Sequence, residues 1–126
     1  MAELIGFATS SKSGLLLKND FIKCMQYCQL ATDKIFKIGK LTTYHGIWIQ
    51  GVETVDCTTI NILISLKSSG QIICANKPSY VTLKVDNENN VYISVPAGRS
   101  IDCIMYGPCV TEIQQISNYP SDAYDI

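Results

Sequence analysis

Arginine, histidine and tryptophan each occur once in this chain of 126 residues, whereas lysine occurs nine times. The ten basic and eleven acidic residues are scattered and give a formal net charge of −1. Nucleic-acid-binding proteins present a basic face that displaces counterions from phosphates, and proteins that bind membrane surfaces carry polybasic segments. The lone Arg99 leaves little scope for bidentate recognition of phosphate. The sequence therefore predicts neither a nucleic-acid partner nor a membrane partner.

Long apolar runs are also missing. The longest apolar-rich stretch, residues 60–66, is interrupted by Asn61 and Ser65, and it is far shorter than the roughly 20 residues that a membrane-spanning helix needs. The first twelve residues have neither a positive leader nor the apolar core of a signal peptide. We therefore expect a soluble protein that is made in the cytoplasm.

Residue patterns of common active sites are absent. No glycine-rich phosphate-binding motif occurs, and a cysteine nucleophile would depend on the only histidine, His45, which has no catalytic signature around it. The acid pairs Glu53 with Asp56 and Asp102 with Glu112 would suit glycoside hydrolysis only at a separation of roughly 5–9.5 Å, and acids near strand ends are usually just solvated. We predict that the protein is not an enzyme and has no cofactor.

Cysteine is plentiful, but its spacing does not suggest a metal site. Cys24 and Cys28 could share an ion, yet no Cys-x-x-Cys pair supplies the further ligands that zinc requires. Free cysteine behaves as a small buried hydrophobe, and thiols persist in the cytoplasm. We therefore expect no metal and mostly reduced core cysteines at positions 24, 28, 57, 74, 103 and 109.

Apolar residues make up 47% of the chain, which is enough for the core of one domain. From Asp33 onward they recur with a period of two. Residues 43–50 place Ile47 and Ile49 on one face and Trp48 on the other. Residues 58–67 place four aliphatic side chains on one face and Leu63 on the opposite face. This alternation predicts half-buried β-strands.

The clearest hairpin lies in the second half of the chain. Residues 80–85 and 91–95 alternate on either side of Asp86–Asn90, whose residues tolerate left-handed turn conformations. Further short strands are expected at 34–38, 71–75, 100–106 and 109–116, and no crossover helix occurs between them. The sequence thus predicts a mainly β fold, a β-sandwich or jelly-roll-like domain of seven to eight strands. Residues 117–126 are either a loose end or a second docking segment.

The front of the chain differs from the rest. Residues 1–18 are interpreted as an extended docking arm, in which the small or polar residues 8–14 lead into Leu15, Leu16 and Leu17. Asn19 or Asp20 can then cap a short helix over about residues 19–29. The apolar stripe of that helix has helical spacing and consists of Phe21, Cys24, Met25 and Cys28. We therefore divide the chain into the arm, 1–18, and one helix-plus-sandwich domain, 19–126.

Outward-facing apolar residues suggest an interface. Strand alternation leaves Leu63 facing outward, and such residues often mark a subunit contact. The aromatic residues Tyr44, Trp48, Tyr80 and Tyr92 lie on strands, where they form either a binding platform or core anchors. We predict a homo-oligomer, with a trimer favoured. The expected docking and interface residues are Leu15, Leu16, Leu17, Phe21, Trp48 and Leu63.

One short segment resembles a known group of proteins. The pattern A-T-x-x-x-x-G-L-(M/L)-x-x-x-D-x-x-K is met by Ala8, Thr9, Gly14, Leu15, Leu16, Asp20 and Lys23. In this respect the chain is similar to fibre and appendage proteins of tailed bacteriophages. The resemblance implies a structural protein of the virion, made in the host cytoplasm, that docks through its arm onto a capsid or tail protein as a head fibre, capsid decoration or tail fibre module. The alternative is a small β-sandwich module that binds carbohydrate, including host-surface carbohydrate, or protein through Trp48 and neighbouring tyrosines.

Overall fold

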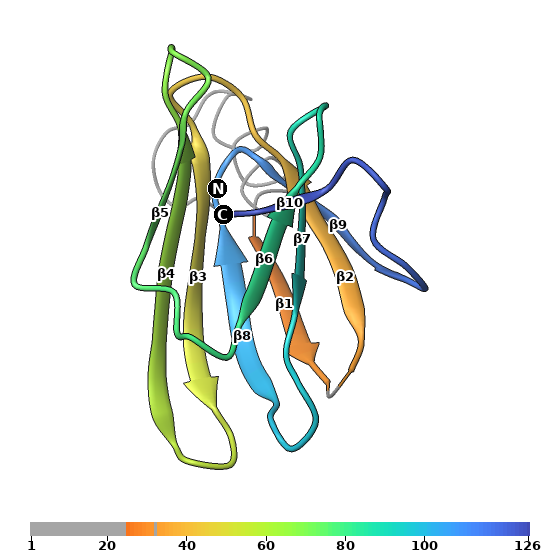
Figure 1. Ribbon diagram of the computed structural model, residues 1–126. Helices are drawn as coiled ribbons and strands as arrows, with labels where there is room; N and C mark the ends of the chain where they lie inside the picture. Colours follow the sequence, from red (N-terminus) through yellow and green to blue (C-terminus); the bar gives the residue numbers. More distant parts are fainter. Residues whose placement is uncertain (1–24, 32) are drawn as a thin grey trace, which may run out of the picture.

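The computed structural model describes residues 25–31 and 33–126. These residues form two five-stranded antiparallel sheets that pack as the layers of a β-sandwich (Figure 1). The first sheet has the order β1-β8-β3-β4-β5, with bounds Met25–Leu30, Ile101–Tyr106, Gly46–Glu53, Thr58–Leu66 and Ile72–Ala75. The second has the order β10-β6-β7-β2-β9, with bounds Tyr124–Asp125, Thr82–Val85, Asn90–Ser94, Ile35–Lys40 and Val110–Ile116. The predicted arm, with Leu15, Leu16 and Leu17, and Phe21 lie outside the described residues.

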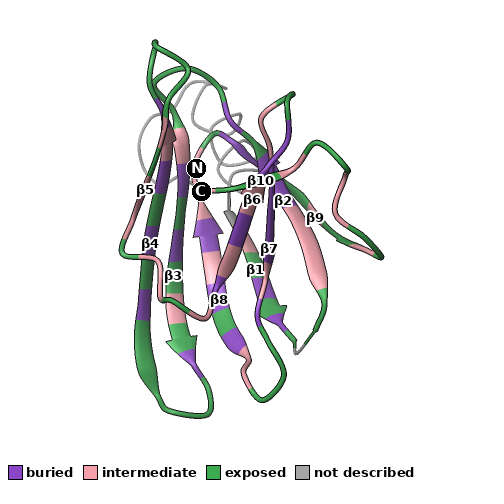
Figure 2. Cartoon of the chain, viewed as in Figure 1, coloured by how far each residue is buried: buried purple, intermediate pink, exposed green. Residues whose placement is uncertain are grey.

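Strand alternation builds the interface between the sheets. In β3, Ile47 and Ile49 are buried while Trp48 is exposed, and in β4 the aliphatic residues are buried while Leu63 is exposed. Figure 2 shows this alternation of buried and exposed residues along β4. Because successive side chains of a strand point to opposite faces, the inner faces of both sheets supply one hydrophobic core. The prediction of a β-sandwich is confirmed.

The predicted helix is wrong over its second half. Residues 25–30 form strand β1, which pairs with β8 so that Cys28 lies opposite Cys103 and Leu30 opposite Ile101. Cys28 and Leu30 are buried, whereas Tyr27 and Gln29 are exposed, which is the two-residue period of a strand. The described residues contain no helix. The segment 19–24, which would hold the rest of the predicted helix, lies outside the described residues.

The number of strands was also underestimated, because the described residues form ten strands rather than seven or eight. The predicted hairpin is present as β6 and β7, which pair in register from Thr82–Ser94 to Val85–Val91. The two unpredicted strands are β1 and the two-residue β10, which pairs with β6 near the end of the chain. The tail is thus part of the sandwich, since Ile126 packs against the core.

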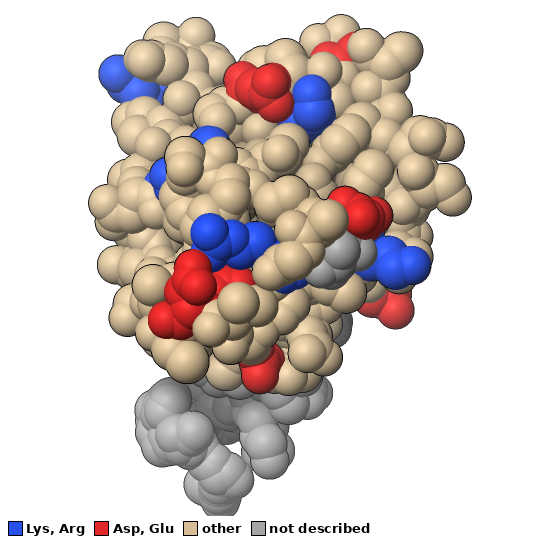
Figure 3. All heavy atoms as spheres, turned by 60° about the horizontal axis from the view of Figure 1, so that its bottom comes forward, with Lys and Arg blue, Asp and Glu red and all other residues tan. Residues whose placement is uncertain are grey.

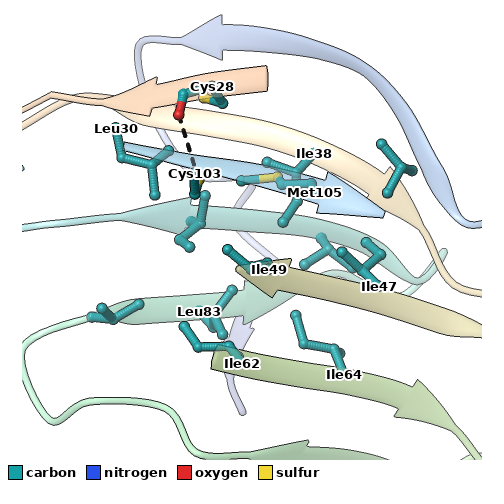
Figure 4. Close-up of a cluster of buried hydrophobic side chains, with 14 of the residues drawn as sticks. Cys28, Leu30, Ile38, Ile47, Ile49, Ile62, Ile64, Leu83, Cys103 and Met105 are labelled. Carbon is teal, nitrogen blue, oxygen red and sulfur yellow. Dashed lines mark hydrogen bonds between the residues drawn. The ribbon is translucent and has the colours of Figure 1, made fainter. Parts of the chain in front are cut away.

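Three of the cysteines are buried in the core as expected, namely Cys28, Cys103 and Cys109. The Cys103 thiol points toward the backbone carbonyl of Cys28, with 3.5 Å between sulfur and oxygen (Figure 4). Cys74 is half-buried, and Cys57 is exposed in the turn between β3 and β4. Burial therefore distinguishes the cysteines from one another.

This difference predicts selective alkylation. Burial raises the pKa of Cys28 to about 11 and that of Cys103 to about 12, so both thiols stay protonated and shielded at pH 8. Because the thiolate is the nucleophile, we expect iodoacetamide to modify them about 100-fold more slowly than the exposed Cys57. Peptide mass mapping of the folded protein measures the rates, and denatured protein is the control. Equal rates for Cys28 and Cys57 in the folded protein would contradict the assignment of Cys28 to the core.

Candidate interface on the outer face of the first sheet

Large apolar side chains are concentrated on the outer face of the sheet β1-β8-β3-β4-β5. Those that are at least 43% exposed are Tyr27, Trp48, Val52, Leu63 and Ile73. The half-buried Ile104 and Tyr106 lie on the same face, because their partners across the strands are Tyr27 and Trp48. We call these seven residues the apolar face.

The centre of the apolar face is one row of side chains across three strands. Trp48 of β3 lies opposite Tyr106 of β8 on one side and opposite Leu63 of β4 on the other. The rings of Trp48 and Tyr106 are stacked, with centroids 4.9 Å apart and planes inclined by 30°. The Trp48 indole N–H donates a hydrogen bond of 2.6 Å to the Asn61 side-chain oxygen. Trp48 is therefore held in one orientation while 43% of it stays exposed.

The stacking of Tyr106 on Trp48 determines which face of the Trp48 indole a ligand could contact. A centroid separation of 4.9 Å equals the spacing of neighbouring strands, so the two rings project side by side from β3 and β8, and each covers one face of the other. Sugar-binding platforms offer an open ring face to the apolar side of a sugar. Trp48 has one face occupied by Tyr106 and its neighbour on the other side is Leu63. This arrangement suits packing against another apolar surface.

The end of the chain covers part of the outer face of the second sheet. Tyr119 packs edge-on against Tyr92, its hydroxyl bonds the Ser94 hydroxyl, and the Lys84 ammonium lies 5.2 Å from its ring centroid. Asp122 accepts a hydrogen bond from the backbone N–H of Asn87. The tail thus packs on its own domain and is not a loose end. Among the described residues, most of the exposed large apolar side chains on the two outer faces lie on the face with Trp48.

The acid pair Glu53 and Asp56 has a structural role in a loop. Glu53 is completely buried, and its carboxylate accepts the backbone N–H groups of Val55, Asp56 and Ser100. The Arg99 guanidinium pairs with both acids and lies 4.2 Å from the ring of Tyr80. Figure 3 shows this end of the molecule, where acidic and basic groups lie beside one another without a patch of one sign.

The protonation state of Glu53 follows from these contacts. The N–H of Asp56 lowers its pKa most, and the N–H groups of Ser100 and Val55 and the Arg99 charge add to this effect against the opposing effect of burial. A buried carboxylate that is held as an anion cannot reach a substrate or act as a general acid. The other acid pair is divided between the sheets, because Asp102 belongs to β8 and Glu112 to β9.

The cysteine–histidine pair that the sequence allowed is not in direct contact. Thr42 lies between the two residues, with its hydroxyl oxygen 3.4 Å from His45 Nδ1 and 3.6 Å from Cys109 Sγ. Cys109 is only 3% exposed, so a substrate has no access to its sulfur. Among residues 25–31 and 33–126, no group of three or more histidine, cysteine, aspartate or glutamate side chains is placed to hold a metal ion.

The structure brings together two of the interface residues predicted from the sequence, Trp48 and Leu63, as direct neighbours. The other aromatic candidates lie elsewhere: Tyr44 in the β2–β3 loop, Tyr80 beneath Arg99, and Tyr92 beneath Tyr119. Sequence reasoning missed five members of the apolar face, namely Tyr27, Val52, Ile73, Ile104 and Tyr106. The alternation of β5 and β8 could have indicated Ile73 and Tyr106, but not their neighbours.

Comparisons with models of protein families, with curated proteins and with solved structures find no match to this chain. Within the part of the chain that the structure describes, no helix has the length and hydropathy needed to cross a membrane.

Proposed function

We propose that this protein is a structural component of a bacteriophage virion, a head fibre, capsid decoration or tail fibre module that acts by assembly. In this proposal it forms a homo-oligomer, with a trimer favoured, and residues 1–18 link it to a larger capsid or tail particle. The observation that carries the proposal is the apolar face around Trp48 and Leu63. The resemblance of residues 8–23 to phage fibre and appendage proteins supports the assignment of the larger particle to a phage capsid or tail.

The apolar face supports assembly by its size and its position. Five large apolar side chains on one sheet remain at least 43% exposed, whereas Tyr119 of the tail covers part of the opposite outer face. Contiguous apolar patches on a soluble protein mark interaction sites. Full burial of one such side chain contributes roughly 1.5–3 kcal/mol, so a partner that covers Trp48, Leu63 and their neighbours gains enough to form a stable contact.

The second candidate is a module that binds carbohydrate or a protein surface. It is supported by the aromatic pair Trp48 and Tyr106 beside the amide of Asn61, because aromatic rings and amides together recognise sugars. The stacking of Tyr106 on one face of Trp48 favours the assembly role instead. Titration of the protein with mono- and oligosaccharides while Trp48 fluorescence is recorded separates the two, since only a sugar-binding module responds.

Assembly is tested by a charge placed in the middle of the apolar face. We expect Leu63→Asp to weaken self-association by about 100-fold or more, because burial of an unpaired carboxylate at an interface is costly. Size-exclusion chromatography with light scattering should give three times the 13.9-kDa chain mass for the natural sequence and a monomer for the variant. The matched control is Gln114→Asp on β9, an exposed position of the other sheet, which should keep the oligomer. A natural chain that stays monomeric up to millimolar concentration would refute the proposal.

A further inference from the structure

We propose that the apolar face of one copy is covered by Leu15–Leu17 of a second copy, so that the arms are exchanged between neighbouring copies. This inference rests on the oligomer proposed above and names the contact that holds it together. It leaves residues 1–14 for attachment to the larger particle. The inference is argued from where the arm joins the sheet, how far it reaches and which residues precede β1.

The described chain begins in the same row as the centre of the apolar face. β1 begins at Met25, whose partner in β8 is Tyr106. The next partners in that row are Trp48 in β3 and Leu63 in β4. Since β1 is the edge strand of the sheet, the first described residue lies at the sheet edge, in the row that contains the centre of the apolar face.

The sequence immediately before β1 lacks residues that favour a turn back over the same sheet. Residues 21–24 contain no glycine, proline, asparagine or aspartate, the residues that favour a reversal of the chain. If β1 continued through these four residues, it would extend roughly 13 Å beyond the end of the sheet. The nearest turn-forming residues are Asn19 and Asp20. If the chain reversed at these two residues, Lys18 and most of the leucines would be needed to run back to the end of the sheet. The leucines would then lie beyond the sheet and not over Trp48 and Leu63.

A second copy removes this difficulty. Seven residues separate Leu17 from Met25, and in extended form they span roughly 23–25 Å. The distance from β1 to β4 across one sheet is three strand spacings, about 14–15 Å. The leucines of one copy can therefore reach the row of Tyr106, Trp48 and Leu63 on a copy placed next to it. Exchange of a terminal segment between identical copies closes an oligomer without any new fold.

The single tryptophan of the chain reports directly on this contact, because Trp48 is at the centre of the apolar face. The acceptor is the full chain with Leu15→Ser, Leu16→Ser and Leu17→Ser, which keeps Trp48. The donor is the full chain with Trp48→Phe, which keeps the arm and has no tryptophan. We expect the acceptor alone to emit at long wavelength and to be quenched readily by acrylamide. Addition of excess donor should shift the emission to shorter wavelength and lower the quenching constant at least twofold.

Two controls isolate the leucines. A donor that carries both Trp48→Phe and the three serine substitutions should have no effect on the acceptor. An acceptor with its leucines intact but with Lys12→Ser and Lys18→Ser should be protected on its own, as the natural chain is. Thermal unfolding of each variant, followed by circular dichroism, verifies that the sandwich is retained.

The remaining outcomes separate this inference from the proposed function. A natural chain that is oligomeric while its Trp48 stays open to acrylamide overturns the arm exchange and leaves assembly standing. In a second outcome, Trp48 of the natural chain stays protected in the monomer at high dilution, and the donor has no effect on the acceptor. This result shows that the arm covers its own sheet, and it also overturns the exchange. A natural chain that is monomeric at every concentration overturns both the exchange and the proposed function.

Discussion

Replacement of Glu53 by alanine is expected to lower the melting temperature by about 10 °C or more, the largest effect of any acidic residue in the described part of the chain. The Glu53 carboxylate is completely buried and accepts three backbone N–H groups from the loops after β3 and β7. Its removal takes away the acceptor of these three donors and one of the carboxylates that pair with the Arg99 guanidinium. Differential scanning calorimetry at pH 7 measures the change.

The matched control is Glu112→Ala on β9, where the side chain is exposed. We expect this variant to melt within about 2 °C of the natural protein, because exposed substitutions away from such networks change stability little. Glu53→Gln should fall between the two, since an amide can accept some of the hydrogen bonds but carries no charge for Arg99. If Glu53→Ala and Glu112→Ala have the same melting temperature, the buried Glu53 carboxylate does not stabilise the loops at this end of the sandwich.

The alternation of apolar residues was sufficient to predict most strands. Ile47 and Ile49 face the core and Trp48 faces outward because a strand has a period of two, and this pattern is local to the sequence. The hairpin of β6 and β7 was predictable for the same reason, since the Asp86–Asn90 turn lies between two alternating segments. Both features depend only on residues that are close in the chain.

The error at β1 shows where such local reasoning ends. Phe21, Cys24, Met25 and Cys28 fit helical spacing, but Cys28 and Leu30 also fit the inward face of a strand. A short apolar run cannot distinguish the two periods. The choice depends on pairing with β8, whose residues lie about 75 positions further along the chain, and no local pattern contains that information.

The candidate interface was predictable only in part for a similar reason. Trp48 and Leu63 were assigned to outward faces individually, and the β3–β4 pairing places them side by side. Tyr106 completes the row through the β3–β8 pairing, which joins segments that are distant in the sequence. The roles of Glu53 and Asp86 were missed because a buried carboxylate looks like any other turn acid until its hydrogen-bond donors are known.

Asp86→Ala is the second substitution for which we expect a large effect. The Asp86 carboxylate is buried and accepts the backbone N–H groups of Glu88 and Asn90, the side-chain amide of Asn90 and the Tyr92 hydroxyl. It thus fixes the β6–β7 turn and satisfies a buried phenol. Hydrogen bonds to charged groups contribute more than neutral ones, so we expect a loss of about 2–4 kcal/mol in the free energy of unfolding. Urea unfolding of the variant beside Asn87→Ala, an exposed position in the same turn, measures this loss.

The same carboxylate should make stability depend on pH in a defined direction. Burial alone would raise the pKa of Asp86, but the hydrogen bonds from Asn90, Tyr92 and Glu88 outweigh it and hold the pKa below its usual value. The folded state therefore binds a proton at Asp86 less readily than the unfolded state, whose aspartates titrate near 3.9. The contribution of Asp86 is complete above about pH 5 and is lost as the pH falls through the folded-state pKa. Asp86→Asn should be less stable than the natural chain at pH 7. Between pH 5 and pH 3 it should lose less stability than the natural chain, and the part of the loss that comes from Glu53 should be the same in both proteins. Parallel pH curves for the two proteins would show that the hydrogen bonds do not hold Asp86 as an anion.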